Sequence, residues 1–155
     1  MVQDTLLNAG ESLPPLRWHS IRYANDSELH LVPDNKRGVY AFSISSPAAS
    51  TPKHGYILYI GLAGRDPRNP ERTPRSLRAR YSDYLKPSYV ESRPTIRRMI
   101  AYWSAVLTFS FAPVDDNLPS DDLHRLERHL NDTFVPPFSQ ADYSTETRQR
   151  RAAFP

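Results

Sequence analysis

Cysteine is absent from the 155 residues, glycine occurs only five times, and lysine only three times. Without cysteine the chain excludes a disulfide scaffold, a cysteine-ligated zinc or iron–sulfur site and a cysteine nucleophile. No apolar run is long enough to span a bilayer, and the first residues lack the basic start and apolar core of a signal peptide. We therefore expect a cytoplasmic protein with no membrane partner.

Arginine, by contrast, is abundant and unevenly distributed. Seventeen of the 20 basic residues are arginine. Residues 61–98 hold ten basic and four acidic residues, whereas residues 113–146 hold two basic and eight acidic ones. The planar guanidinium binds a phosphate through two hydrogen bonds, so the basic block suggests a polyanionic partner. A solvated surface in an arginine-rich chain is the alternative.

The order of apolar and breaker residues predicts a small α+β domain. Strands are expected over 38–45, 56–62 and 105–112, and helices over 76–86, from about 94, and over 121–134. Ser76 and Ser120 are expected to cap the first and the last of these helices, and Pro87 to end the first. A hairpin joins the first two strands, and residues 64–75 form a loop because prolines interrupt them. The result is a three-stranded, mainly antiparallel sheet flanked by helices, in the order β-β-α-α-β-α.

The predicted domain occupies residues 37–139. Residues 1–36 form an N-terminal extension, in which residues 16–23 can supply one extra strand. Residues 140–155 form a C-terminal tail, of which we expect residues 144–155 to fray. A chain of this size buries roughly 70% of its unfolded surface, so it needs neither a metal nor a disulfide to fold.

One acidic residue falls on an apolar helix face. Leu123, Leu126, Leu130 and Phe134 define the buried stripe of the helix over 121–134, and Glu127 lies inside the same arc. His124 is expected on the outer face of this helix. A buried carboxylate costs several kcal/mol unless it is paired or binds a metal. A buried arginine partner explains Glu127 as well as a Mg²⁺ ion does.

Two tripeptides and two later residues carry a family resemblance. Residues 38–40 read Gly-Val-Tyr and residues 59–61 read Tyr-Ile-Gly, with Arg80 in a following helix and Glu127 in a later one. Pro136 follows that glutamate by nine positions. In this order and spacing, the chain resembles the GIY-YIG nuclease family over residues 37–139.

The resemblance implies a metal-dependent DNA endonuclease that hydrolyses phosphodiester bonds with one Mg²⁺ or Mn²⁺ ion. Glu127 would be the metal ligand and Arg80 would bind the scissile phosphate. Tyr59 would take a proton from the attacking water, while Tyr40 and Tyr84 orient that water. A phenol with a pKa near 10 needs a shift of about three pH units to act as a base at neutral pH.

The resemblance also names residues that shape the site and marks where this chain departs from the pattern. Gly38, Gly61 and Ser139 occupy site-shaping positions. Ser139 stands where the family often has asparagine, and Leu62 follows the second tripeptide where some members have lysine. Both departures bear on how active the site is.

Arginines of the basic block are the expected contacts to double-stranded DNA. Contacts of this kind give affinity and salt sensitivity rather than base specificity. The candidates are Arg65, Arg68, Arg72, Arg75, Arg78, Arg93, Arg97 and Arg98.

Two other functions remain open from the sequence. One is a catalytically weak or inactive module that binds nucleic acid or a protein partner without cutting. The other is a subunit that needs a partner chain for activity or targeting. A homodimer is equally compatible with the chain, because little sequence outside residues 37–139 is available to choose a target.

Overall fold

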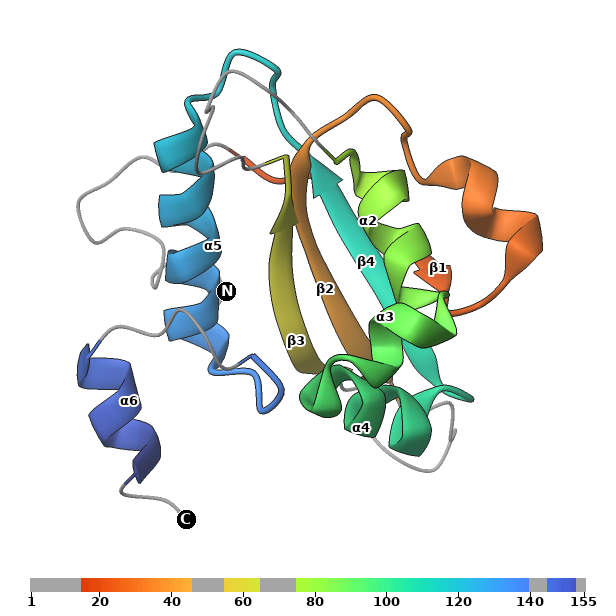
Figure 1. The fold of residues 1–155 in the computed structure, drawn as a ribbon. Helices are drawn as coiled ribbons and strands as arrows, with labels where there is room; N and C mark the ends of the chain where they lie inside the picture. Colours follow the sequence, from red (N-terminus) through yellow and green to blue (C-terminus); the bar gives the residue numbers. More distant parts are fainter. Residues whose placement is uncertain (1–14, 46–54, 65–74, 140–144, 153–155) are drawn as a thin grey trace.

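The computed structural model describes residues 15–45, 55–64, 75–139 and 145–152. These residues form an α+β structure in which helices pack on both faces of a four-stranded antiparallel sheet, with strand order β1-β4-β2-β3 (Figure 1). The fold class predicted from the sequence is confirmed at this level. Among the described residues, no helix combines the length and the apolarity needed to cross a membrane.

The centre of the sheet is the predicted hairpin of β2 (Gly38–Ser45) and β3 (Gly55–Ala63). Tyr40 pairs with Gly61 and Phe42 with Tyr59, and the register shifts between Phe42 and Ser43. Alternate residues of a strand point to opposite faces of the sheet. The tyrosine of the first tripeptide therefore shares a face with the tyrosine and glycine of the second.

The sheet has four strands, so the expected three-stranded sheet is wrong by one strand. β1 (His19–Arg22) pairs with β4 (Leu107–Pro113) at the edge of the sheet, and Ile21 stands opposite Phe109. An extra strand within residues 16–23 was one of the possibilities predicted from the sequence. A short 3-10 helix, η1 (Asp26–Leu31), then leads to β2. Part of the N-terminal extension thus belongs to the sheet.

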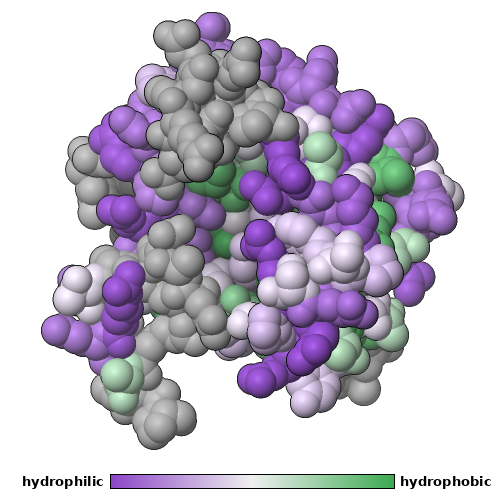
Figure 2. Space-filling model, in the orientation of Figure 1, coloured by the Kyte–Doolittle hydropathy of each residue, from purple (hydrophilic) through white to green (hydrophobic). Residues whose placement is uncertain are grey.

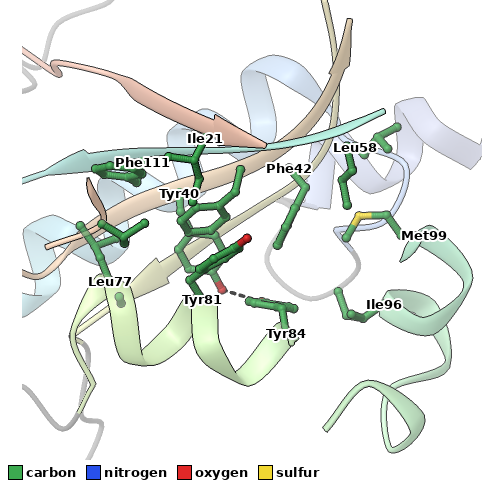
Figure 3. Packing of buried hydrophobic residues seen from close by; sticks show 14 residues of the cluster. Ile21, Tyr40, Phe42, Leu58, Leu77, Tyr81, Tyr84, Ile96, Met99 and Phe111 are labelled. Atoms are coloured by element: carbon green, nitrogen blue, oxygen red, sulfur yellow. Dashed lines mark hydrogen bonds between the residues drawn. The ribbon is translucent and has the colours of Figure 1, made fainter. Parts of the chain in front are cut away.

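Three helices cover one face of the sheet: α2 (Leu77–Tyr84), α3 (Pro87–Glu91) and α4 (Pro94–Trp103). The Ser76 side chain accepts a hydrogen bond from Ala79 N and caps α2 as expected. Pro87, which was expected only to end the preceding helix, begins α3 because proline suits a first helical turn. Aromatic and aliphatic side chains fill the space between these helices and the sheet (Figure 3).

The opposite face is covered by α5 (Ser120–Phe134), which packs Leu123, Leu126 and Leu130 against β2 and β3. The expected buried stripe is too long by one turn, because Phe134 is 51% exposed at the end of the helix. The expected serine cap is also wrong. Pro119 is the N-cap residue, and Ser120 is the first helical residue.

The segment after α5 returns to the sheet. Phe138 N donates to Leu58 O over 2.9 Å, so residues 136–139 lie along the outer edge of β3. The tail then forms α6 (Thr145–Ala152). The expectation of a frayed tail is therefore wrong for these eight residues, whereas residues 140–144 and 153–155 lie outside the described part.

Candidate functional site

Three tyrosines from two strands and one helix lie together between helix α2 and the sheet. Tyr40 comes from β2, Tyr59 from β3 and Tyr84 from the last turn of α2. The hydroxyls of Tyr40 and Tyr84 are 2.6 Å apart (Figure 3), and the Tyr59 ring centroid lies 6.2 Å from that of Tyr40 and 6.3 Å from that of Tyr84. The hairpin register and the helix position together bring all three phenols into one cluster.

The glycines of the two tripeptides are required by close packing. A Cβ atom on Gly61 would lie 2.5 Å from Tyr40 Oη and 3.0 Å from the Tyr59 ring. A Cβ atom on Gly38 would lie 2.2 Å from Ala112 O on the neighbouring strand. Gly61 thus makes room for the tyrosine cluster, and Gly38 allows β2 and β4 to approach.

Arg80 lies on α2, one turn before Tyr84. Its Nε atom is buried and has no hydrogen-bond partner in the described part of the chain. Burial by itself would lower the pKa of Arg80, but the phenols of Tyr40, Tyr89 and Tyr84 close to it raise that pKa overall. The guanidinium is therefore a permanent positive charge with an unused donor beside the tyrosine cluster.

Glu127 is buried on α5, with 8% of its surface exposed, as its place in the apolar stripe predicted. Its charge reaches the tyrosine cluster, because it is one of the groups that raise the pKa of Tyr59. His124, one turn earlier, places Nδ1 3.5 Å from Glu127 Oε2. A carboxylate and the phenol cluster are thus brought together from opposite faces of the sheet.

All three phenols hold their protons more tightly than a free tyrosine does. Burial raises the pKa of Tyr40, and the neighbouring Tyr59 raises it further, while Arg80 partly offsets the rise. Burial likewise raises the pKa of Tyr59 and of Tyr84. At neutral pH the cluster is uncharged and acts through hydrogen bonds.

Glu127 is the residue at this site that could hold a divalent cation together with a substrate. Within the described ranges, no group of three or more histidine, aspartate and glutamate side chains is placed to hold a metal ion. Mg²⁺ commonly takes one or two carboxylates from the protein and completes its shell with phosphate oxygens and water. The buried Glu127 carboxylate is suited to that arrangement and unsuited to a closed, all-protein cage.

Ser139 ties the segment after α5 to the second tripeptide. Its hydroxyl accepts a hydrogen bond from Ile60 N over 2.9 Å and donates to Ile60 O over 3.3 Å. The side chain is 5% exposed. Ser139 therefore holds the edge of β3 next to Tyr59, without being a member of the tyrosine cluster.

The predicted DNA-contacting arginines fall into different environments. Arg75 forms an ion pair with the buried Asp83. Arg78 donates from Nε to Val32 O over 2.7 Å and from a terminal nitrogen to His30 O over 3.2 Å, so its guanidinium binds the end of η1. Neither side chain belongs to the tyrosine cluster.

Exposed arginines remain on the α3–α4 side. Arg93, at the N-terminus of α4, and Arg97 and Arg98 within that helix are exposed. The remaining three candidates, Arg65, Arg68 and Arg72, lie outside the described residues.

Two residues at the site were not singled out from the sequence. Tyr89 lies beside Arg80 because α3 follows α2 directly, and no helix was expected over 87–91. His124 was assigned to the outer face of its helix, yet its side chain is only 14% exposed. Its spacing of three residues before Glu127 was the available signal.

No protein-family model, curated protein or solved structure matches this chain significantly. The geometry itself offers a permanent cation, a cluster of neutral phenols and a buried carboxylate. Those groups can bind a phosphate, orient water and hold a divalent cation.

Proposed function

We propose that the protein is a metal-dependent DNA endonuclease that hydrolyses phosphodiester bonds and has a GIY-YIG-like fold and site. One observation carries the proposal. Arg80, with its unpartnered buried Nε, adjoins Tyr40 and Tyr84, while Glu127 acts on Tyr59 in the same cluster. The five groups come from two strands and two helices, and local packing alone does not require this combination of charges.

Arg80 is assigned to the scissile phosphate. A guanidinium donates planar, paired hydrogen bonds that suit phosphate oxygens, and its charge stabilises the negative charge that grows on them. Because Nε is buried and has no partner in the described part of the chain, binding a phosphate would satisfy a donor that the free protein leaves unused.

Tyr59 is assigned to the attacking water, with Tyr40 and Tyr84 holding its position. The Tyr40–Tyr84 hydrogen bond fixes both hydroxyls, and Tyr59 neighbours both rings. Burial keeps Tyr59 protonated in the free protein. It therefore orients water first, and proton transfer to it requires positive charge near the bound substrate to offset the effect of burial.

Glu127 is assigned to the divalent cation. Bound Mg²⁺ or Mn²⁺ would supply positive charge that stabilises the transition state of phosphodiester hydrolysis. His124 lies within 3.5 Å of the carboxylate and can hold its orientation. The carboxylate thus has both a neighbour that positions it and a phenol on which its charge acts.

DNA is the proposed substrate because of the basic surface beside the site. Hydrophilic side chains make up most of the coloured surface in Figure 2, and Arg97 and Arg98 are exposed on α4, which covers the same face of the sheet as the helix of Arg80. Such contacts release counterions, so affinity should fall steeply as salt rises. Replacement of Arg98 by alanine should reduce the slope of log K against log salt by about one.

A second candidate, a module that binds DNA without cutting it, is supported by the pKa values. Burial raises the pKa of Tyr40, Tyr59 and Tyr84, so the free protein holds no phenolate base at neutral pH. The same phosphate and DNA contacts would serve binding alone.

Incubation with supercoiled plasmid separates the two candidates. With Mn²⁺ or Mg²⁺ present, the endonuclease proposal expects conversion of supercoiled plasmid to the nicked form, and chelation by EDTA should stop it. Plasmid that is retarded on a gel but remains supercoiled would support the binding module instead. Plasmid that is neither cut nor retarded would contradict both functions.

A further inference from the structure

Tyr89 is a partly buried tyrosine on α3 that the proposed mechanism does not use. Its hydroxyl oxygen is buried near the Arg80 guanidinium and makes no well-directed hydrogen bond within the described part of the chain. A buried hydroxyl without a partner destabilises the folded protein, so native structures rarely keep one without a reason. The other exceptions at this site include Arg80 Nε.

The Tyr89 ring is held from two sides. The Tyr84 ring meets it edge to face, with centroids 5.4 Å apart. The Arg93 guanidinium carbon lies 4.3 Å from its ring centroid in a cation–π contact. The ring position is therefore fixed by packing, and the hydroxyl is not needed to hold it.

The hydroxyl lies beside the phosphate-binding candidate. Tyr89 is close enough to the Arg80 guanidinium to raise its pKa, both as a neighbouring phenol and through a side-chain hydrogen bond, and it also acts on Tyr40 and Tyr59. That contact is not well directed, and Arg80 Nε has no partner in the described part of the chain. Because a guanidinium only donates, the O–H of Tyr89 and the N–H of Arg80 Nε are both left to donate to a ligand that accepts from both.

We propose that Tyr89 is a substrate-binding residue. Its hydroxyl donates a hydrogen bond to the same phosphate group that Arg80 binds, so this inference rests on the proposed function. A phosphate has several acceptor oxygens, so one group can satisfy both donors. Arg93 positions the ring from the exposed side.

The alternative is that Tyr89 has a packing role only. The ring contacts with Tyr84 and Arg93 would then account for the residue, and the hydroxyl would contribute nothing. Tyr89→Phe separates the two, because it removes the hydroxyl and keeps the ring. Tyr102→Phe is the matched control, since Tyr102 is 72% exposed on α4.

The test measures binding and cleavage in wild type, Tyr89→Phe and Tyr102→Phe. Binding is followed by fluorescence anisotropy of a labelled DNA duplex in EDTA, and cleavage by plasmid nicking with Mn²⁺. A hydrogen bond to a charged group is worth enough that Tyr89→Phe should raise the Kd or the KM about 10-fold. Tyr102→Phe should stay within about 2-fold of wild type.

Thermal unfolding distinguishes a substrate-binding hydroxyl from one that only stabilises the fold. Because the hydroxyl makes no well-directed hydrogen bond in the described part of the free protein, Tyr89→Phe should unfold at the wild-type temperature or slightly above it. Weaker DNA binding together with an unchanged or higher Tm supports the proposal. DNA binding and cleavage within about 2-fold of wild type, or a lowered Tm, would overturn it.

The outcomes separate failure of this inference from failure of the proposed function. Wild-type protein that nicks plasmid while Tyr89→Phe does so equally well contradicts only the role of Tyr89. If wild-type protein binds DNA without nicking it, the endonuclease proposal fails, and the role of Tyr89 is still tested by comparing the Kd values. Wild-type protein that neither binds nor nicks DNA overturns both.

Discussion

The hydroxyls of Tyr40 and Tyr84 lie 2.6 Å apart in the protein interior, one contributed by strand β2 and the other by helix α2. The chain separates these residues by 44 positions, so the contact depends on how the helix docks on the hairpin. The tyrosine of the first tripeptide is thereby joined to the helix that carries Arg80. This contact makes the cluster a structural unit.

Gly61→Ala should damage that unit, whereas Gly55→Ala should not. The new Cβ at position 61 would lie 2.5 Å from Tyr40 Oη, but at position 55 the nearest atom is 3.9 Å away. Overpacking of this kind costs about 1–3 kcal/mol. We expect Gly61→Ala to lower the Tm by several degrees and Gly55→Ala to leave it nearly unchanged, as measured by circular dichroism. Equal Tm values for the two variants would contradict the packing described.

The tyrosine cluster should make the fold sensitive to alkaline pH. Burial raises the pKa of Tyr40, Tyr59 and Tyr84 above the ordinary value of 10.0. A group whose pKa is higher in the folded protein contributes stability that is complete below its unfolded pKa and is lost as pH rises toward the folded value. The Tm should therefore be steady below about pH 9.5 and fall above about pH 10.

Tyr40→Phe provides the control for that pH dependence. It removes one buried phenol, so the fall in Tm above pH 10 should be shallower than in wild type. Thermal unfolding measured in steps from about pH 8 to about pH 11 tests both statements. A wild-type Tm that does not change across this range would contradict the assignment.

Ser139→Ala should destabilise the protein more than the loss of an exposed serine does. It would remove the acceptor for Ile60 N and leave a buried backbone donor unpaired, at a cost of about 1–3 kcal/mol. Ser110→Ala is the matched control, because its hydroxyl bonds to Ser20 at an exposed position. Urea unfolding should rank the two variants in that order, and the reverse order would contradict the role of Ser139.

Arg80→Lys should keep the charge and lose most of the activity. Lysine cannot reproduce the planar, paired donors of the guanidinium, and the loss of one transition-state donor typically costs about 100-fold in kcat. Arg22→Lys, on the exposed edge strand β1, should nick plasmid at the wild-type rate. Full nicking activity in Arg80→Lys would mean that Arg80 does not bind the reacting phosphate.

The sequence alone predicted the elements that have a local residue pattern. Runs rich in β-branched and aromatic residues located β2 and β3, and the helical period placed Glu127 among the leucines of α5, where it is buried. These are local properties, so one chain is enough to reveal them.

Features that depend on packing between distant segments were beyond the sequence. The sequence allowed a strand over residues 16–23, but it did not show that β1 pairs with β4 at the edge of the sheet. Tyr89 reaches Arg80 because α3 turns back after Pro87, and Arg78 is occupied by carbonyls near η1. Composition predicted a positively charged region, but it did not distinguish arginines that bind the protein itself from those that face solvent.

The central claim is that the Glu127 carboxylate holds the divalent cation for phosphodiester hydrolysis, and Glu127→Gln tests it most directly. Glutamine keeps nearly the same shape and removes the negative charge that the cation requires. Glu91→Gln is the matched control, because Glu91 is exposed on α3. Plasmid nicking with Mn²⁺ should be abolished in Glu127→Gln and unchanged in Glu91→Gln, with both variants folded by circular dichroism. Nicking by Glu127→Gln at the wild-type rate would contradict the claim.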